Sequence, residues 1–589
     1  MVQTSFRTDS GSADERIVVP IGIIRLIRSG FKRYGLHDLF NNFKDSGVPL
    51  GTVIENICTS CLCEDYSMKD WDAYVNRSPL RKQFFCGDHD VRRWTLQRGL
   101  DRIGDYLEEV VEHLTKVLRT LDPDAPTHVN VDGSHIKRNG SKGSNVSYGE
   151  GGGSVQLQNQ FMTASLIGSC IPVSIELYPG NVNDPTQYMD FIPQLLFHLK
   201  AESLIVMDNG GSGSKILDEI KSFDCEYLTR ASMNKSNDTR IVDECDRMIY
   251  VGMNAACIKH TFGSSNRTTY LFFSADSYAA SLSRAEKAVK SLEKDRIRAQ
   301  NILTSGNPDS FIKIDDSPFF TVEYENAKFV MTRDPWIEMD VDSELKKAVA
   351  PRNGWFKLEC SFEMDPRLAL VVYRHRVDVE HMISVLKSVV NLDPLRVWSE
   401  GSTRGRLVIA LVTDFILSMF IKDLEPRKEV RNIDGKPVET MMKPSGKTVI
   451  KELRRYEGLV TPYPWGGFNV AEIRDKGVCD DFVKLFDEYD KTGSIKIPEN
   501  LVWRHNRPAQ WDSKEKNSKN LAMSIAQHLS ENIFPSFMAR RCAWKTIDPS
   551  SPMMCRRLSD ISGASSGAPG LVGRGSYYPG SKDLFGKKT

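Results

Sequence analysis

No segment of this sequence is both long and apolar enough to be expected to cross a membrane. The most apolar run, "LVIALVTDFILSMFI" (407–421), is too short for a bilayer and contains Asp414. The first 16 residues are polar and lack the apolar centre of a secretory signal. We therefore expect a cytoplasmic protein without membrane association, and a buried helix over 407–421.

Cysteine is also scarce, with 12 among 589 residues, and its thin scatter is typical of reduced cytoplasmic thiols. One group, "CTSCLC" (58–63) with "CGDH" (86–89), has side chains that could bind zinc. Its first three cysteines, however, lie in an apolar helical run, and the second segment is only half a site. A structural role is the stronger interpretation.

The sequence has almost no excess of charge of one sign, since 78 Lys and Arg face 77 Asp and Glu. Overall charge therefore does not indicate a nucleic-acid partner. Two segments are locally basic: "VRRWTLQRGLDR" (91–102), and residues 501–589, which hold 14 Lys and Arg against 6 Asp and Glu. Such segments suit a partner bound at several places, although a solvated surface is the ordinary alternative.

The chain is too long for a single hydrophobic core, and its pattern changes along its length. Apolar positions at helical spacing predict a compact helical region that ends in one long helix around 100–117. Strands predicted at 127–136, 159–168 and 171–180 are followed by a helix over 184–200, a strand over 203–208, a helix over 214–223 and a strand over 225–231. A three-stranded meander followed by βαβ units predicts an α/β fold. The predicted divisions are 1–121 (helical), 122–235 (α/β core), 236–352 (β-rich insertion with a charged helix near 278–300), 353–425 (core resumed), 426–500 (small mixed module) and 501–589 (basic tail, partly disordered).

Two aspartates stand where an α/β sheet commonly places ligand chemistry. Asp132 lies in the first strand of the meander, and Asp208 ends the strand "LIVMD" before "NGGSGS". Each alone is more often a helix cap or turn residue. Together on neighbouring strands they form a more specific pattern.

A third carboxylate occurs in "YRHRVDVEHMISVLK" (373–387), which we predict to be one helix with an apolar stripe. The large polar side chains Tyr373, Arg376, Glu380 and Lys387 would share a seam beside this stripe. A partly buried ladder of ion pairs explains such a seam, and so does a catalytic acid flanked by anion-binding groups. Three convergent carboxylates would repel one another unless cations neutralised them, and oxygen ligands suit Mg²⁺ or Mn²⁺, with two ions expected.

These segments resemble DDE transposases of the insertion-sequence four superfamily. The spacing Y-(2)-R-(3)-E-(6)-K of the 373–387 stretch resembles their signature. In the same order, "VDGSHI", "PVSIELYPGNVNDPTQ" and "LIVMDNGGSGS" resemble the strands that carry their first and second aspartates. The segment 392–417 resembles the one that follows the signature, and the similarity extends over roughly residues 30–490.

The resemblance implies a ribonuclease-H-like catalytic core, with a β-rich insertion in the 172-residue gap between Asp208 and Glu380. It also implies that Asp132, Asp208 and Glu380 bind the metal ions and catalyse phosphoryl transfer. The DNA-binding residues would be Tyr373, Arg376, Lys387, Trp398 and Arg404, with Trp398 stacking on a displaced base. A core or interface position is an equally good interpretation of Trp398.

The implied function is cleavage at the inverted-repeat ends of a prokaryotic insertion element and joining of the 3′-hydroxyls to target DNA. Double-stranded DNA is the expected partner, the active complex is expected to be a homodimer, and the protein is expected at the nucleoid. Region 1–121, with Arg92, Arg93, Arg98 and Arg102, matches the family's end-binding region in position. The chain departs from many relatives in having no basic residue directly after Asp208. A DNA-binding derivative that no longer cuts and another nuclease of the same fold, such as a resolvase, are the alternatives.

Two glycine-containing motifs are poor phosphate-binding candidates. "PSGKT" (444–448) ends like a Walker A motif, but position 441 is Met and no buried strand is predicted before it. "GEGGGS" (149–154) lies between predicted strands without a following helix, which predicts a hairpin connection.

Overall fold

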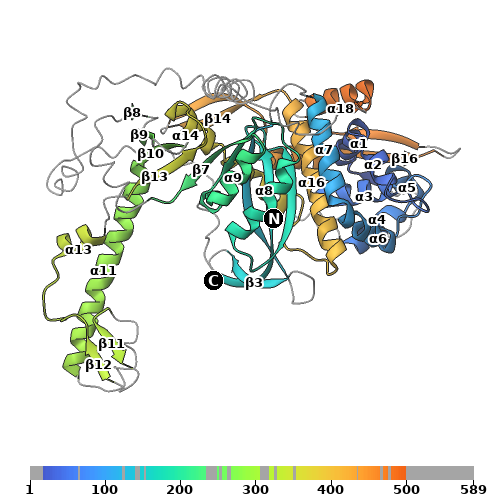
Figure 1. Ribbon diagram of the computed structural model, residues 1–589. Coiled ribbons are helices and arrows are strands. Elements are labelled where there is room, and N and C mark those ends of the chain that lie inside the picture. The colour runs from blue at the N-terminus through green and yellow to red at the C-terminus, as the bar shows by residue number, and fades with distance from the viewer. Residues whose placement is uncertain are drawn as a thin grey trace. The chain divides into compact units, whose positions relative to one another are not determined.

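The structure is a computed structural model of the chain (Figure 1). The predicted basic tail 501–589 lies outside the described residues, as do residues 1–16 and part of the glycine-rich connection around 149–154. The described residues are 17–63, 67–121, 127–138, 146–151, 154–233, 249–250, 255–261, 267–305, 318–323, 328–348, 353–433, 436–463, 468–474 and 479–498.

The chain divides into two compact units. The first comprises residues 1–229, 360–431 and 437–541, and the second comprises 230–359, 432–436 and 542–589. The chain therefore leaves the first unit within the strand Glu226–Ala231 and returns to it shortly before the segment that holds Glu380.

A mixed sheet forms the centre of the first unit. β4 pairs antiparallel with β2 along one edge, while its other edge pairs first with β3 and then with β5. On the far side of β2, β6 and then β7 pair in parallel. This order, with three antiparallel strands followed by two parallel ones, is consistent with a ribonuclease-H-like core. The strands are β2 (Val129–Lys137), β3 (Ser147–Gly151), β4 (Ser154–Leu166), β5 (Pro172–Pro179), β6 (Leu204–Met207) and β7 (Glu226–Ala231).

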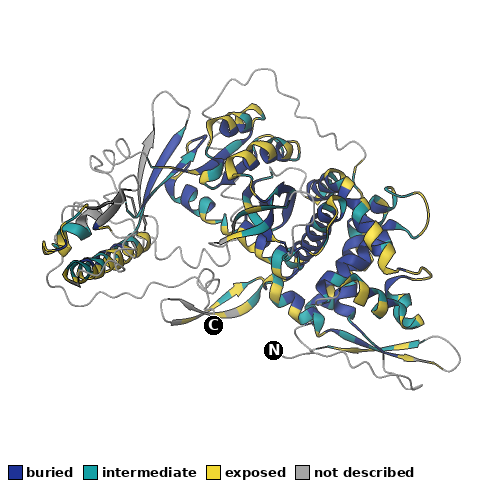
Figure 2. Cartoon of the chain, turned by 90° about the horizontal axis from the view of Figure 1, so that it is seen from below, coloured by how far each residue is buried: buried dark blue, intermediate teal, exposed yellow. Residues whose placement is uncertain are grey.

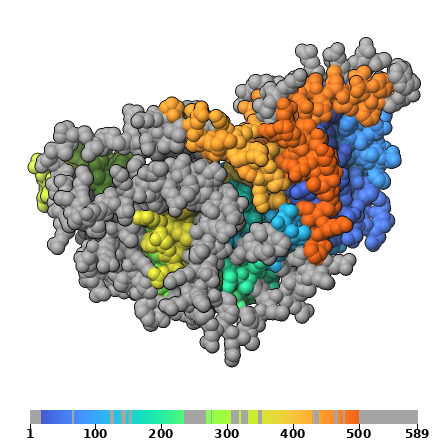
Figure 3. Space-filling view, turned by 90° about the horizontal axis from the view of Figure 1, so that it is seen from above, coloured from blue at the N-terminus to red at the C-terminus, as the bar shows by residue number. Residues whose placement is uncertain are grey.

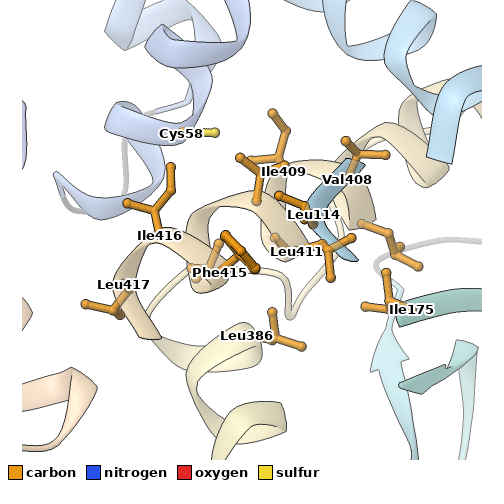
Figure 4. Packing of buried hydrophobic residues seen from close by; sticks show 14 of the residues in the cluster. Cys58, Leu114, Ile175, Leu386, Val408, Ile409, Leu411, Phe415, Ile416 and Leu417 are labelled. Carbon is orange, nitrogen blue, oxygen red and sulfur yellow. The ribbon is translucent and has the colours of Figure 1, made fainter. Parts of the chain in front are cut away.

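Helices cover both faces of this sheet. Paired residues share a face, so Asp132, Thr163 and Ile175 point the same way, and Figure 4 shows Ile175 against Val408 and Leu411. Helices α7, α15 and α16 therefore cover the face that carries Asp132. The opposite face carries Tyr178, whose hydroxyl donates to Asp190 of α8. The helices are α7 (Leu107–Leu121), α8 (Asp184–Leu196), α9 (Ser214–Ser222), α15 (Val377–Ser388) and α16 (Glu400–Asp423).

The predicted buried helix over 407–421 is confirmed as the centre of α16. Every residue from Leu407 to Phe420 is buried, and the helix contacts α1, α3, α6, α7, α15 and β5 (Figures 2 and 4). None of the described helices combines the length and apolar character needed to cross a bilayer.

The region before the sheet is helical, as predicted, but its last helix is not continuous. A short 3-10 turn, η1 (Gly104–Tyr106), separates α6 from α7. A Cβ atom at Gly104 would lie 2.1 Å from the carbonyl oxygen of Gly401, so glycine allows α16 to approach at the break. The sequence prediction of one long helix was wrong here, because the apolar spacing runs through both helices. The helices are α1 (Ile21–Arg33), α2 (Leu36–Asn41), α3 (Leu50–Leu62), α4 (Met68–Asn76), α5 (Pro79–Phe85) and α6 (Arg93–Ile103).

The segment after α16 packs against the helical N-terminal region. β1 pairs with β16, which pairs with β17, so strands from both ends of the described chain form one sheet. Helix α18 lies along α1, where Arg25 forms an ion pair with Asp487 at 2.7 Å (Figure 3). In "PSGKT", Ser445 caps α17 by accepting a hydrogen bond from the Thr448 N–H. The elements are β1 (Ile17–Val19), β14 (Arg427–Ile433), β15 (Lys436–Met442), α17 (Gly446–Arg454), β16 (Glu457–Pro462), β17 (Phe468–Ile473) and α18 (Asp480–Thr492).

The described part of the second unit, within residues 230–359, holds six strands and two helices. Its 31-residue helix α11 is longer than any described strand of the unit and is exposed or half-buried along most of its length (Figure 2). The Ala-, Lys-, Glu- and Arg-rich sequence of this segment has high helix propensity. The elements are β8 (Ile249–Tyr250), β9 (Ala255–Thr261), β10 (Thr268–Ser274), α11 (Ala275–Ser305), β11 (Phe320–Glu323), β12 (Lys328–Met331), α13 (Val341–Ala348) and β13 (Trp355–Cys360).

Candidate active site

The register of β2 against β6 places Asp132 and Asp208 at the same level. Val129 pairs with Ile205 and Asn130 with Val206, an offset of 76 residues. Asp132 and Asp208 are separated by the same 76 residues, so each stands two residues beyond the last paired position on its strand. Neighbouring strands lie about 4.8 Å apart, so the two predicted aspartates are close neighbours.

Asp208 is tightly held at the end of β6. It caps the short turn η2 (Asn209–Gly211), with its Oδ1 accepting from the Gly210 N–H at 2.8 Å. The same oxygen accepts from the Tyr188 hydroxyl at 3.0 Å, and the Asp208 carbonyl accepts from Thr229 Oγ1 at 2.8 Å. One carboxylate oxygen therefore has two donors.

The 373–387 stretch is two helices rather than the single helix predicted. α14 (Pro366–Arg374) ends at a turn, and α15 begins at Val377. The His375 carbonyl accepts from Asn130 Nδ2 of β2 at 2.9 Å, which ties the turn to the sheet. The His375 ring lies 3.2 Å from Asp378 Oδ2, which also accepts from the Gly168 N–H at 2.8 Å. These contacts come from distant segments, so local periodicity could not predict the break.

The break brings Arg376 to the sheet, between two of the predicted catalytic residues. Its Nη1 donates to Asp132 Oδ2 at 2.7 Å, and its Nη2 donates to Glu380 Oε1 at 2.6 Å. The Arg376–Glu380 pair is the i,i+4 ion pair that the structural interpretation of the seam predicts. The contact with Asp132 extends the ion pair beyond the helix and joins Glu380 to the aspartate pair.

The ionisation of the site reflects burial and the clustering of acids. Burial raises the pKa of Asp132 to about 6, with Asp208 and Glu380 acting in the same direction and Arg376 against them. Burial also raises the pKa of Tyr188 well above its usual value, helped by Asp208, so this hydroxyl keeps its proton as a donor. The pKa of Asp184, at the start of α8, is raised by burial and by Asp208.

The carboxylate oxygens of Asp132, Asp208 and Glu380 suit a hard divalent cation, but they do not converge on one point. Within the described part of the chain, no three Asp, Glu, His or Cys side chains are placed to hold a metal ion as they stand. The Arg376 guanidinium occupies the space between Asp132 and Glu380. Among the hydrogen bonds of the described residues, Asp208 Oδ2 and Glu380 Oε2 accept none, so both remain available as ligands. Both Asp132 oxygens already accept hydrogen bonds, Oδ1 from the Gly133 N–H and Oδ2 from Arg376. Carboxylate oxygens are typical ligands of Mg²⁺ or Mn²⁺.

A cationic cluster continues from the acids toward the end of β2. Burial and the neighbouring Lys137 lower the pKa of Lys387, while Asp393 opposes them. Burial and Lys387 likewise lower the pKa of His135. The loop after α15 is fastened here, since the Lys137 N–H donates to Asp393 Oδ1 at 2.9 Å and the Lys137 carbonyl accepts from the Leu395 N–H at 3.1 Å.

The predicted aromatic residues lie at the two sides of this cluster. Tyr373 is half-buried in the last turn of α14, as an electrostatic neighbour of Arg376. Trp398 is 53% exposed just before α16, and the preceding carbonyl of Val397 accepts from Arg138 at the end of β2. An exposed indole is available for stacking, which a core position would not allow.

Arg404 is not brought to the acids. It lies on α16 with Nη2 3.9 Å from Glu176 of β5, and β4 separates β5 from β2. The arginines of the N-terminal region also differ in their surroundings. Arg92 pairs with Asp72 and Asp90, whereas Arg98 and Arg102 line an open hollow of about 510 Å³ with Ser399 and Gly401, the residues that follow Trp398.

Sequence reasoning missed three residues of this region: Tyr188 and Asp184, which lie beside Asp208, and Lys137, which lies beside Lys387. Asp184 lies within "PVSIELYPGNVNDPTQ", which resembles a segment of the family, and Tyr188 directly follows this segment. Lys137 directly follows the "VDGSHI" motif. Their proximity depends on strand register and on helix packing, which single-sequence patterns do not contain.

Comparison with known proteins identifies the sheet region. Residues 123–413, just under half of the chain, match the family described as "Transposase DDE domain". This part of the chain is therefore similar to transposase DDE domains. A solved structure described as a piggyBac transposase synaptic complex with hairpin DNA aligns at 11% identity with a TM-score of 0.33, covering 86% of this chain and 91% of that one. Comparison with curated proteins gives no significant match.

Proposed function

We propose that the chain is a DNA transposase of the insertion-sequence four superfamily, encoded by a prokaryotic element and acting at the nucleoid. It would cut at the inverted-repeat ends of its element and join the freed 3′-hydroxyls to target DNA. One observation carries the proposal. In the region that matches the transposase DDE domain, Asp132 and Asp208 stand level on neighbouring parallel strands, and Arg376 links Asp132 to Glu380.

In this proposal Asp132, Asp208 and Glu380 hold Mg²⁺ or Mn²⁺, most simply as two ions. The bound cations would supply activation of the attacking water or 3′-hydroxyl and stabilisation of the leaving oxygen. The half-buried Asp132 and the firmly held Asp208 would provide one side of the site. Glu380, on a helix and half-exposed, provides the other side.

The cations along the site would bind the DNA backbone. Arg376 is suited to a phosphate because its planar fork can donate two parallel hydrogen bonds. Lys387 and Lys137 would contact the strand beyond the scissile phosphate, and Trp398 would stack on a base at the cut. Region 1–121 would bind the element end, and two protomers would act together so that both ends are cut.

The test is strand cleavage by the full chain on duplex DNA that carries the sequences flanking its own coding region. Incubation with Mg²⁺ should give nicks at the repeat boundary in the parent protein. Asp208→Asn and Glu380→Gln should bind the same DNA but leave it uncut. Glu109→Gln, which changes an exposed carboxylate on α7, serves as the matched control and should cut normally.

The alternatives predict other outcomes. If the parent and the Glu380→Gln variant both bind the repeats and neither cuts, the chain is a DNA-binding derivative. If the parent prefers branched DNA to linear ends, a resolvase is favoured. Cleavage that persists in Asp208→Asn and in Glu380→Gln would contradict the proposed site.

A further inference from the structure

Tyr188 touches both aspartate-bearing strands from the helix that covers the opposite face of the sheet. It lies on α8 with only 2% of its surface exposed. Its hydroxyl oxygen is 3.0 Å from Asp208 Oδ1 and 3.4 Å from the carbonyl oxygen of Val131, the residue before Asp132. A hydroxyl has one proton, and the charged acceptor at the shorter distance is the stronger partner.

The turn that holds Gly210 and Gly211 packs closely against the ring of Tyr188. A Cβ atom at Gly210 would lie 3.0 Å from the Tyr188 Cε2 atom, and one at Gly211 would lie 3.2 Å from Cε1. The Cβ at Gly211 would also come within 2.9 Å of Met207 Cβ. Side chains at these positions would push the turn off the ring. Since the Gly210 N–H donates to the same Asp208 oxygen, the turn and the tyrosine hold that oxygen together.

We propose that Tyr188 is a positioning residue that fixes the Asp208 carboxylate and leaves Oδ2 as the oxygen offered to the cation. The inference rests on the proposed function, because it assigns Asp208 to the metal site. Two donors on Oδ1 oppose rotation of the carboxylate, and Oδ2 accepts no hydrogen bond from the described residues. Hydrogen-bond partners of this kind orient ligating carboxylates, and their loss typically costs about 10–100-fold in metal affinity or activity.

A purely structural role for Tyr188 makes a different prediction. Many buried tyrosines only need a hydrogen-bond partner, and removal of the hydroxyl then affects stability alone. Tyr178 is a matched example, since it is buried and donates to Asp190 of α8 at 2.9 Å, away from the acids. Tyr188→Phe and Tyr178→Phe each remove one hydroxyl that donates to a carboxylate.

The experiment is a titration of the full chain with Mn²⁺, following free Mn²⁺ by electron paramagnetic resonance, without DNA. Tyr188→Phe should bind Mn²⁺ about 10-fold or more weakly, and Tyr178→Phe should bind it like the parent. Thermal unfolding of both variants shows whether the fold is kept. In the cleavage assay, Tyr188→Phe should lower kcat while the KM for DNA stays unchanged.

Asp208→Asn separates failure of the inference from failure of the proposed function. If Asp208→Asn loses Mn²⁺ binding and Tyr188→Phe does not, the positioning role is wrong and the metal site stands. If Asp208→Asn binds Mn²⁺ like the parent, Asp208 is not a ligand and the proposed site itself fails. A Tyr188→Phe variant that no longer folds would assign the hydroxyl to stability and would also overturn the positioning role.

Discussion

Arg376 forms an ion pair with Asp132 at 2.7 Å, across 244 residues of sequence. Its second terminal nitrogen donates to Glu380, one turn further along α15. Asp132 and Glu380 together raise the pKa of Arg376, although burial alone would lower it. One guanidinium therefore neutralises charge on two carboxylates. The proposed function also requires this guanidinium to bind a phosphate of the DNA.

Arg376→Gln tests this balance. Without divalent cations, Asp132 and Glu380 would lose their counterion, so we expect the free energy of unfolding to fall by about 1–3 kcal/mol for this partly exposed pair. Loss of a phosphate-binding group should also reduce cleavage by at least about 100-fold. Urea unfolding in the presence of a chelator measures the first effect, and the cleavage assay measures the second.

Arg374→Gln is the control for this prediction. Arg374 is exposed and lies two residues earlier, at the end of α14. It should leave cleavage unchanged and alter stability only slightly. If Arg376→Gln behaves like Arg374→Gln in both assays, the ion pairs of Arg376 contribute neither to stability nor to cleavage.

Lys137 gives a prediction about DNA affinity. Its charge lies beside that of the half-buried Lys387, and a phosphate placed between them would relieve their repulsion. Lys137→Ala should weaken binding to all duplex sequences and reduce the slope of log affinity against log salt by about 1. The measurement is a fluorescence-anisotropy titration at several salt concentrations.

Lys116→Ala is the matched control for Lys137→Ala. Lys116 lies on α7 and already pairs with Glu112 at 2.6 Å. Its removal should leave the salt slope unchanged. An equal loss of slope in both variants would point to a diffuse effect of net charge rather than to a contact at Lys137.

Sequence could predict those site residues that lie in local patterns, namely apolar strand segments and the spacing of the 373–387 signature. Asp132 and Asp208 follow or lie within apolar strand segments, and both strands form as expected, as β2 and β6. Glu380 was recognised through the spacing of its signature. The equal offset of 76 residues in the sequence and in the β2–β6 register then places the aspartates together.

What could not be predicted depends on contacts between distant segments. The turn at His375 is fixed by Asn130, and the break at Gly104 by the approach of Gly401. Tyr188 and Lys137 lie at the site because of helix packing and loop attachment. A single sequence encodes these contacts but does not display them as periodicity or spacing.

The close packing of α6 against α16 gives a stability prediction. A Cβ atom at Gly405 would lie 2.0 Å from the Leu100 carbonyl oxygen, and backbone cannot move aside as a flexible side chain can. Gly405→Ala should lower the free energy of unfolding by about 1–3 kcal/mol. Gly446→Ala, whose Cβ would meet its nearest neighbours at 3.4 Å, should change it by less than about 0.5 kcal/mol. Equal effects in urea unfolding would show that the helices do not pack this closely.

Asp414 gives a prediction about pH. It is 1% exposed in the middle of α16, and its Oδ2 has no hydrogen-bond partner among the described residues. Burial raises the pKa of Asp414 well above its usual value, so the folded protein keeps a proton that the unfolded chain releases above about pH 4. Because the folded state then binds more protons, this group makes the protein less stable as pH rises from about 4 toward neutrality, by at most about 1.4 kcal/mol per pH unit.

Asp414→Asn removes this proton release while keeping the shape of the side chain. We expect the variant to be more stable than the parent at pH 7, by about 1–2 kcal/mol, and the difference to shrink toward pH 4.5. Asp423→Asn, on the same helix, should instead lower stability, because Asp423 accepts a hydrogen bond from the Tyr489 hydroxyl at 2.6 Å. Urea unfolding of the three proteins at both pH values measures these differences. A gap between Asp414→Asn and the parent that does not change with pH would mean that Asp414 is ionised in the fold, and that its charge is neutralised by a partner outside the described residues.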